Sequence, residues 1–312
     1  MRRPSPRGWR CCGRSSARTG RRLLARRPAA RASSRWQRSV PPTRQRARLR
    51  PTARQGRGRR GGSERPVRLA VLSDVHANLE ALRAVLDHAG AQAPDALVCL
   101  GDFVGYGPDP NACVDVLAGR VRAAVVGNHD LAALGARPIA DFNLWAQEAI
   151  VWTQRMLTAS TRAYLAALPD RAHLADLADL LFVHGSPRAP ADEYILDVRT
   201  ARASFAAAGF RIAMVGHTHQ PAVFTWARHR VGAVGLLPEV PLRLEPEHRY
   251  IINVGSVGQP RDGDPRAAYV LLDTGRREAT LFRVAYPIAE VQRKMEAAGL
   301  PTPLIERLAL GL

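Results

Sequence analysis

The sequence predicts an α/β fold in which two β-sheets face each other and helices cover their outer sides. Between residues 67 and 127, apolar runs alternate with helical patterns in the order strand, helix, strand, helix, strand, which favours parallel pairing. After residue 219, strands and turns follow one another closely, as expected for a second, mostly antiparallel sheet. Residues 66–312 are long enough for one large domain with a buried core.

The first half of this domain begins with a strand at 69–73, followed by a helix that Asn78 caps and whose apolar residues recur at helical spacing. A second strand at 96–100, a short helix around Cys113 and a third strand at 123–126 complete this unit. Asn78 needs no role beyond that of a helix cap.

A largely helical segment is predicted between residues 130 and 184. One helix begins at Asn143 and another at Ser160. The first helix carries a stripe of large apolar residues, which is either a lid over a site or a buried helix face, and its spacing favours the buried face. The stripe consists of Leu144, Trp145, Ala149, Trp152 and Met156.

The remaining elements are predicted from their apolar runs and the turn residues between them. They are a strand at 180–183, a helix at 197–209, strands at 212–215, 221–226, 242–244, 249–254, 267–272 and 278–284, a helix at 288–298 and a short helix before Gly311.

The positive charge of the chain lies in an N-terminal extension. Residues 1–65 contain 22 Arg and one acidic residue, whereas residues 66–312 carry a net charge close to zero. An Arg-rich segment with much Pro, Ser and Gly is predicted to be disordered. It is either an arm for RNA, membranes or other polyanions, or the product of a start codon assigned too early, and we favour the second interpretation. The folded part lacks the basic surface of a nuclease, so it should require no nucleic acid.

Targeting signals and cysteine patterns favour a cytoplasmic protein. The paired arginines near the N-terminus precede no apolar run of a secretory signal, and no stretch approaches membrane-span length. We therefore expect no membrane partner. The four cysteines show neither zinc-site spacing nor a framework of disulfide pairs, which fits a reducing compartment.

Candidate metal ligands follow five of the predicted strands, a repetition that chance does not explain. The candidates are Asp74, His76, Asp102, Asn128, His184, His217 and His219. Glycines at 101, 127, 185 and 216 let the backbone turn tightly beside them. Imidazole nitrogen with Asp and Asn oxygen, and no thiolate, suits Mn, Fe or Zn rather than Ca²⁺ or a structural zinc site.

Seven ligands are too many for one ion but fit two ions that share Asp102, because the other six then supply about three ligands to each ion. Two ions about 3.5–4 Å apart can activate a water molecule and clamp a phosphoryl group. The sequence therefore predicts a dinuclear site for phosphoester hydrolysis.

The motifs Asp-x-His, Gly-Asp, Gly-Asn-His-Asp, His-Gly and Gly-His-x-His occur in this order between residues 68 and 282 and resemble those of the calcineurin-like metallophosphoesterase superfamily. The resemblance implies a four-layer α/β/β/α sandwich of two mixed sheets. It also implies a phosphatase or phosphodiesterase that acts on a small phosphorylated substrate with two divalent ions, with Mn²⁺ preferred and Fe, Zn, Ni or Mg as alternatives.

Individual roles follow from the same resemblance. Asp74, His76, Asp102 and His219 would hold the first ion, and Asp102, Asn128, His184 and His217 the second. His129 would be no ligand and would instead donate a proton or a hydrogen bond to the phosphate or leaving oxygen. Arg261 lies in a loop similar to the Gly-Ser loop of prokaryotic members and is either a phosphate-binding residue or a solvated turn residue.

The chain departs from two branches of the superfamily at Gly105-Tyr106-Gly107, where protein phosphatases and diadenosine tetraphosphatases carry an arginine. This departure favours the small prokaryotic phosphodiesterase and phosphatase branch over those activities. Tyr106 would offer one neutral hydrogen bond and a ring that can lie against a base or an aryl ester. A non-catalytic scaffold of the same fold is the alternative from another class, but its ligand set would usually be broken.

Overall fold

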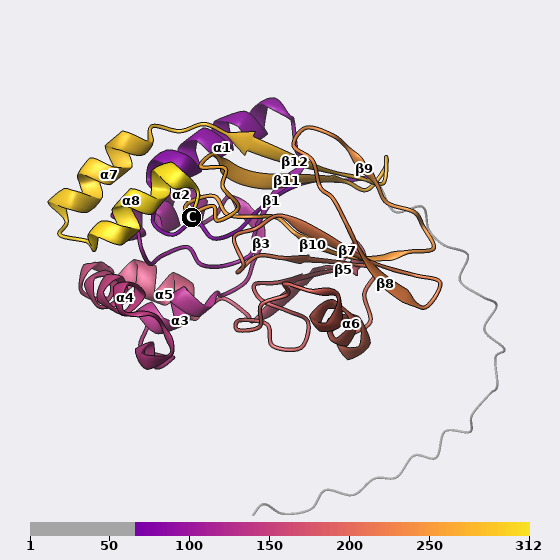
Figure 1. Ribbon diagram of the computed structural model, residues 1–312, viewed down its shortest axis with the longest axis horizontal. Helices are drawn as coiled ribbons and strands as arrows, with labels where there is room; N and C mark the ends of the chain where they lie inside the picture. The colour runs from indigo at the N-terminus through magenta and orange to yellow at the C-terminus, as the bar shows by residue number, and fades with distance from the viewer. Residues whose placement is uncertain (1–65) are drawn as a thin grey trace, which may run out of the picture. The chain divides into compact units, whose positions relative to one another are not determined.

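The computed structural model describes residues 66–312, which form two six-stranded sheets (Figure 1). The first sheet contains β1 (Arg68–Leu72), β2 (Ala96–Cys99), β3 (Val121–Ala124), β9 (Leu242–Arg243), β11 (Ala267–Asp273) and β12 (Glu278–Val284). The second contains β4 (Arg171–Leu174), β5 (Leu177–Val183), β6 (Ile212–Val215), β7 (Ala222–Ala227), β8 (Arg230–Val234) and β10 (Arg249–Asn253). The predicted extension, residues 1–65, lies outside the described residues.

The helices complete a four-layer α/β/β/α arrangement (Figure 1). They are α1 (Leu79–Ala91), α2 (Pro110–Leu117), α3 (Asn128–Ala133), the short 3₁₀ helix η1 (Ile139–Asp141), α4 (Leu144–Met156), α5 (Ala159–Ala166), α6 (Val198–Ala207), α7 (Ile288–Ala297) and α8 (Thr302–Leu310). Helix α6 covers the second sheet, and α1 and its neighbours cover the first. The predicted fold is therefore confirmed.

The core between the two sheets comes from the alternation of side chains along each strand. Leu69 and Val71 of β1 point inward, where they meet residues of the other sheet such as Phe182 and Ile252. Intervening residues such as Ala70 face the outer helices instead. Both faces of β1 are covered, which explains its uninterrupted apolar run.

Each sheet contains a group of parallel strands that ends at the same side of the molecule. In the first sheet, β1 pairs with β2 and β2 with β3. In the second sheet, β5 pairs with β6 and β6 with β10. Because parallel strands end together, the loops that follow these six strands converge. These loops carry all of the candidate ligands.

The strands after residue 219 do not form a separate sheet, so that prediction was wrong. β11, β12 and β9 extend the first sheet through antiparallel pairing of β11 with β1. β10, β7 and β8 extend the second sheet beside β6. The apolar pattern of a strand shows that it is buried but does not identify its partner. The prediction also missed β4 and β8, which lie at the ends of the second sheet and have several exposed residues.

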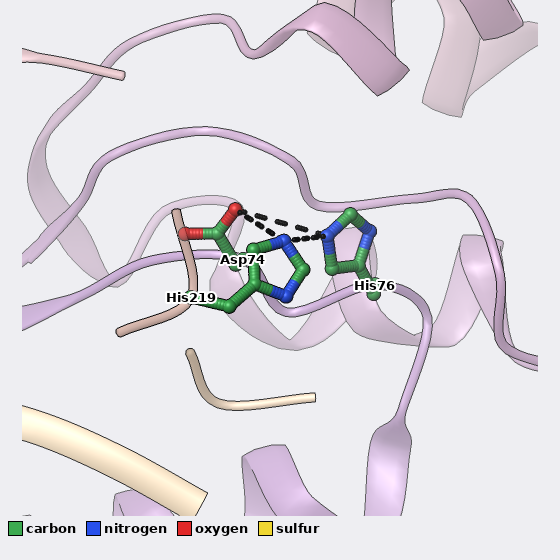
Figure 2. A group of neighbouring side chains, drawn as sticks. All are labelled: Asp74, His76 and His219. Atoms are coloured by element: carbon green, nitrogen blue, oxygen red, sulfur yellow. Dashed lines mark hydrogen bonds and ion pairs between the residues drawn. The ribbon is translucent and has the colours of Figure 1, made fainter. Parts of the chain in front are cut away.

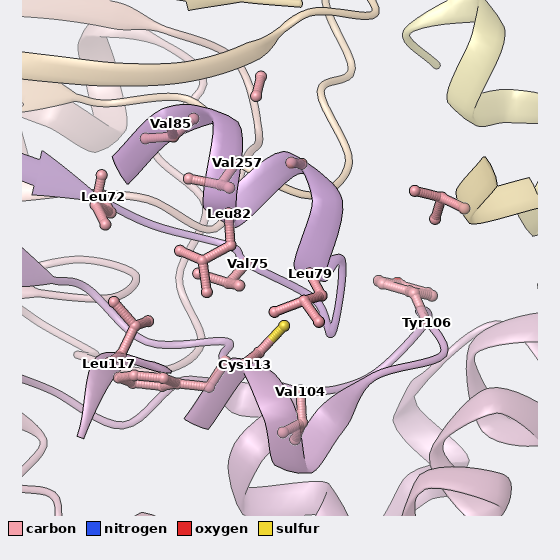
Figure 3. Packing of buried hydrophobic residues seen from close by; sticks show 14 of the residues in the cluster. Leu72, Val75, Leu79, Leu82, Val85, Val104, Tyr106, Cys113, Leu117 and Val257 are labelled. Atoms are coloured by element: carbon pink, nitrogen blue, oxygen red, sulfur yellow. The ribbon is translucent and has the colours of Figure 1, made fainter. Parts of the chain in front are cut away.

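Helix α1 forms as predicted. The Asn78 side chain accepts a hydrogen bond from the backbone N–H of Ala81 at 3.1 Å and so caps the helix. Leu79, Leu82 and Val85 are buried on one face of the helix, where they pack near Cys113 and Leu117 of α2 (Figure 3). This packing fixes the loop between β1 and α1, which carries two candidate ligands.

The buried face of α4 differs from the predicted stripe. Leu144 is 73% exposed, Trp145 49% and Met156 47%. The buried residues are Ala146, Ala149, Ile150 and Thr153. Small alanine side chains allow α4 to approach its neighbours α2 and α3, so the helix turns these residues inward and leaves most of the large ones outside. Of the predicted stripe, only Ala149 is buried, whereas Trp152 is partly buried.

The C-terminal helices pack beside α1. Lys294 of α7, the only lysine of the chain, pairs with Glu80 of α1 at 2.9 Å and with Asp109 at the start of α2. Gly311 ends α8 in the left-handed conformation, with φ of 67°. Within residues 66–312, no helix combines the length and apolar character needed to cross a membrane. Cys99 and Cys113 are buried free thiols.

Candidate metal centre

All seven predicted ligands lie together where the parallel strands end. They are Asp74 and His76 after β1, Asp102 after β2, Asn128 after β3, His184 after β5, and His217 and His219 after β6. None of them is more than 5% exposed. Ligands therefore come from both sheets, which no single stretch of sequence would place together.

The first group consists of Asp74, His76 and His219 (Figure 2). Oδ1 of Asp74 lies 3.2 Å from Nε2 of His219 and 3.7 Å from Nε2 of His76. The two Nε2 atoms are 3.1 Å apart. Three potential ligand atoms thus surround one small volume.

The second group consists of Asp102, His184 and His217, with Asn128 beside them. Nε2 of His184 lies 3.3 Å from Oδ2 of Asp102, 3.1 Å from Nδ1 of His217 and 3.0 Å from Oδ1 of Asn128. Oδ2 of Asp102 is also 3.6 Å from Nε2 of His76 in the first group. The Asp102 carboxylate therefore lies between the two groups, where a shared ligand is required.

Backbone carbonyls set the tautomer of each of the four histidines. A carbonyl only accepts hydrogen bonds, so the ring nitrogen that contacts it must carry the proton. The pairs are His76 Nδ1 with Val104 O at 3.2 Å, His184 Nδ1 with Leu100 O at 2.8 Å, His219 Nδ1 with Gln259 O at 2.6 Å and His217 Nε2 with Asp192 O at 3.1 Å. The other nitrogen of each ring faces the groups described above and is available to a metal.

The spacing of these ligand atoms suits divalent ions held between them better than it suits direct contact between the atoms. Two neutral imidazole nitrogens with lone pairs 3.1 Å apart repel, yet Nε2 of His76 and Nε2 of His219 make this contact in the first group. Oδ1 of Asp74 and Oδ2 of Asp102 are buried and lack a hydrogen-bond partner within residues 66–312. Two ligands that each lie about 2.1 Å from one ion are about 3.0–3.4 Å apart in ordinary coordination geometry. The donor set therefore suits cations held between these residues.

The charges in the site also alter proton binding. Burial lowers the pKa of the His184 ring, but the negative charge of Asp102 outweighs burial and raises the pKa to about 9. Burial and the neighbouring His219 hold the pKa of His76 well below its usual value. Before any ion binds, the buried carboxylates therefore attract a proton to the site.

The ligand loops contain strained backbone. Five ligands have left-handed φ, namely Asp74 (54°), His76 (48°), Asp102 (53°), His217 (66°) and His219 (60°). Such conformations cost about 1–3 kcal/mol each in residues other than glycine, so the surrounding fold must hold them in place. Two of the glycines that were predicted to let the backbone turn tightly lie in close contact with neighbouring side chains. A Cβ atom at Gly127 would lie 2.0 Å from Asp102 Oδ1, and one at Gly216 would lie 1.9 Å from Ser73 Oγ.

Asp130 holds the loops after β2 and β3 together. Its Oδ2 accepts hydrogen bonds from the backbone N–H groups of Asp102 at 2.8 Å and Gly127 at 3.0 Å, and its Oδ1 accepts one from Val104 at 3.2 Å. Asp130 is the last residue of the Gly-Asn-His-Asp motif, and no role was predicted for it. The sequence feature that could have indicated a role is its position two residues after the ligand Asn128. In the structure, this position lies on the first turn of α3.

His129 lies beside both groups without the anchoring contact of the four histidines above. One of its ring nitrogens lies within 4.8 Å of the candidate ligand atoms of Asp102 and His76. Its Nδ1 is buried and has no hydrogen-bond partner among the described residues. Burial lowers its pKa to about 4, and the charge of Asp102 opposes this shift. The predicted role as a proton donor rather than a ligand stays a prediction.

Arg261 and Tyr106 lie next to each other at the edge of the site. The Arg261 guanidinium is 5.6 Å from the centre of the Tyr106 ring and donates to Oε1 of Gln259 at 2.7 Å. The described part of the chain contains no acidic partner for it. The Tyr106 ring is only 5% exposed and packs against His76 and His129, with ring centres 4.7 and 4.3 Å away. Tyr106 nevertheless lines the cavity over the site, so the prediction that its ring lies against a substrate group stays a prediction.

A cavity of about 280 Å³ opens over the site. It is lined by Tyr106, Asn128, His129, Arg137, Asp141, Phe142, Asn143, Asp192, Tyr194, His217 and Arg261. No sequence pattern pointed to four of these residues, because they belong to segments between elements and match no motif; they are Arg137, Phe142, Asp192 and Tyr194. The cavity connects the candidate ligands with a wall that contains both aromatic and charged side chains.

Residues 67–277 match the family model described as the calcineurin-like phosphoesterase superfamily domain. The chain belongs to the calcineurin-like phosphoesterase superfamily. An uncharacterized protein of Methanocaldococcus jannaschii is 35% identical over 251 residues, which cover 78% of this chain and 98% of that protein. Together with the histidine and aspartate groups, membership in this superfamily fits a metal-dependent phosphoesterase.

Two solved structures share the fold. The metallophosphoesterase from Sphaerobacter thermophilus is 41% identical, with a TM-score of 0.70 over 80% of this chain and 100% of that one. A hypothetical protein from Pyrococcus horikoshii has a TM-score of 0.66 at 20% identity over 79% of this chain and 99% of that one, which supports the fold alone. Because the first of these neighbours is a metallophosphoesterase, it also supports a hydrolase in general.

Proposed function

We propose that the protein hydrolyses phosphomonoester or phosphodiester bonds with two divalent metal ions. Among the possible metals, Mn²⁺ suits the mixed nitrogen and oxygen ligands best. The observation that carries this proposal is Oδ2 of Asp102, which is buried, lacks a hydrogen-bond partner within residues 66–312 and lies between the two groups of ligands. Two ions there would supply an activated water molecule and neutralise the charge of the phosphoryl group.

Asp102 and His129 would have further roles in the reaction. Asp102 holds the backbone N–H of His129 at 2.8 Å, which keeps this histidine beside the phosphoryl position. His129 then donates a proton to the leaving oxygen. Its low pKa before substrate binds means that the negative phosphoryl group must raise that pKa for the ring to act as an acid.

Arg261 provides the positive charge on the cavity side of the site. Its backbone N–H donates to His219 O at 3.2 Å, which attaches the loop to the candidate ligands. Its guanidinium lines the cavity and has planar donors that match phosphate oxygens. We assign it to a phosphate oxygen that the ions do not contact.

The substrate we propose is a small phosphorylated molecule in the cytoplasm, with no membrane or nucleic-acid partner for the folded part. A protein phosphatase or a diadenosine tetraphosphatase is the alternative activity, and Tyr106 disfavours it, because this position provides no guanidinium for a dianionic phosphate. A non-catalytic scaffold is disfavoured by the seven ligands, none of which is replaced.

The test is a substrate screen of the purified protein loaded with Mn²⁺. It compares nitrophenyl phosphate with bis-nitrophenyl phosphate, followed by nucleotides and phosphopeptides, with the metal held constant. We expect hydrolysis of at least one nitrophenyl ester that a chelator abolishes and Mn²⁺ restores. Metal-loaded protein that binds Mn²⁺ but hydrolyses none of these esters would support the scaffold, and a strong preference for phosphopeptides would support the protein phosphatase.

A further inference from the structure

The accessible aromatic surface of the cavity comes from Tyr194 rather than Tyr106. Tyr194 lies in the loop between β5 and α6 and stacks on the ring of His217, with ring centres 3.9 Å apart and an interplanar angle of 13°. It is nevertheless 47% exposed. Since His217 covers one face of the ring, the exposed area belongs to the other face and the edge. A planar face is thus available next to a candidate metal ligand.

Phe142 adds a second aromatic ring to the same cavity. It lies between η1 and α4 and meets His129 edge-on, with ring centres 4.9 Å apart and an interplanar angle of 73°. It is partly buried and lines the cavity together with Tyr194. One aromatic ring therefore touches the proposed proton donor, and the other touches a candidate ligand.

Arg137 fixes the segments that carry these rings. Its guanidinium lies 5.4 Å from the centre of the Phe142 ring and forms an ion pair with Asp192, two residues before Tyr194. The carbonyl of Asp192 also accepts the Nε2–H of His217. The aromatic wall is thus held in place by contacts to the same residues that orient the metal site.

The charges of the cavity limit the kind of substrate that fits. Asp192 neutralises Arg137, whereas Arg261 has no acidic partner within the described range 66–312. One free guanidinium beside the metal ligands suits one phosphoryl group. It does not suit a chain of phosphates, which would need further cations along the cavity. The rest of the wall combines the aromatic rings of Phe142 and Tyr194 with polar side chains, among them Asn128, Asp141 and Asn143.

We propose that Tyr194 and Phe142 form a subsite for a flat aromatic group esterified to the phosphate of the substrate. Aromatic groups of this kind include nucleobases and aryl rings, which stack on aromatic side chains with little dependence on their identity. The subsite rests on the proposed function, because it requires the phosphoryl group to lie at the metal ligands. It adds the class of the esterified group, which the metal ligands do not determine.

The test measures binding rather than turnover. Phenylphosphonate and methylphosphonate carry the same anionic group, are not phosphoesters and differ in the aromatic ring. Calorimetric titration of the Mn²⁺-loaded protein should show that phenylphosphonate binds more tightly by roughly tenfold, within the range of stacking on aromatic side chains. Tyr194→Leu and Phe142→Leu should each reduce this ratio several-fold. Tyr194→Phe should retain it, because the ring is preserved.

Trp145→Leu is the matched control, since Trp145 is an aromatic residue that is 49% exposed and does not line the cavity. It should leave the ratio unchanged. Manganese content and methylphosphonate affinity are measured for each variant, because a disturbed His217 would lower both. If Tyr194→Leu loses its metal, the ratio measured with Phe142→Leu tests the subsite. A wild-type ratio that survives in Phe142→Leu and in metal-loaded Tyr194→Leu would overturn the subsite alone. Binding of neither phosphonate to the wild-type protein would instead contradict the proposed function, and the subsite with it.

Discussion

The carboxylate of Asp102 joins two functions through its two oxygens. Oδ1 accepts the backbone N–H of His129 at 2.8 Å, while Oδ2 faces the ring nitrogens of His184 and His76 at 3.3 and 3.6 Å. Asp102, which two ions would share, therefore also holds the backbone N–H of His129, the proposed proton donor, in the first turn of α3. Under the proposed function, metal binding and acid catalysis would be coupled through this one side chain.

Asp102→Asn should lower turnover by several orders of magnitude while the protein remains folded. The amide keeps a hydrogen-bond acceptor for His129 but removes the negative charge between two cations, so at least one ion should be lost. Metal analysis and circular dichroism of the variant test this. Asp176→Asn is the control, because that carboxylate is 50% exposed and pairs only with Arg122. Two ions per chain and near-wild-type turnover in Asp102→Asn would contradict the shared role.

His129→Ala should keep its metal and lose turnover by roughly 10²–10⁴, which is the usual contribution of a positioned general acid. The loss should be smaller for nitrophenolate than for an alkoxide leaving group, because a good leaving group needs no proton. Turnover of both ester types is compared with that of His229→Ala, which changes an exposed histidine. Loss of metal from His129→Ala would make it a ligand, and equal losses for both esters would argue against the acid role.

Asp130→Asn should destabilise the loops after β2 and β3 by about 1–3 kcal/mol, because an amide group would face a backbone N–H and leave a buried donor without a partner. The affinity for metal should fall as well, since Asp102 is held by this network. Chemical denaturation with and without Mn²⁺ measures both effects. Unchanged stability of the metal-free variant would show that the three hydrogen bonds are dispensable.

Metal binding should release a proton near neutral pH. The pKa of His184 is about 9 before an ion binds, so its Nε2 carries a proton that the metal must displace. Below that pKa, the apparent affinity should rise with pH by up to about tenfold per unit, because fewer protons compete. Calorimetric titration with Mn²⁺ in two buffers of different ionisation enthalpy counts the protons released. Identical heats in both buffers would rule out this linkage.

A chain that begins at Val67 should fold and turn over substrate like the full chain. Within the described residues 66–312, the hydrophobic clusters contain no residue before Val67. An Arg-rich segment supplies no apolar surface for a core. Thermal unfolding and turnover of both chains, at matched metal, are the measurements. Failure of the shorter chain to fold, or loss of its activity, would give the extension a role that its composition does not suggest.

The sequence was most informative where one local rule determines the structure. The cap at Asn78, the apolar strand β1 and the motif residues after the strands depend on neighbours along the chain, and their predicted placement agrees with the structure. The pairing of β1 with β11 could not be predicted in this way, because its residues are about 200 positions apart and several strands had equally apolar sequences.

Other features depended on packing between distant segments. The apolar spacing of α4 matched a buried stripe, yet the approach of α3 selected Ala146 and Ile150 for the interior. Likewise, Tyr106 is adjacent to the motif residue Gly105 in sequence, but the rings of His76 and His129 cover it. Tyr194 lines the cavity and stacks on His217, a contact that no sequence pattern encodes.

The division of the ligands between two sheets would couple ion binding to folding. Without cations, the facing ring nitrogens of His76 and His219 would repel each other; with cations, the same ligands would connect one sheet to the other. At free metal about a thousandfold above its dissociation constant, this linkage would add about 4 kcal/mol to the stability of the folded state. The lifetime of the protein would therefore depend on the supply of metal ions, because a chain without ions would unfold and be degraded sooner than a chain with ions.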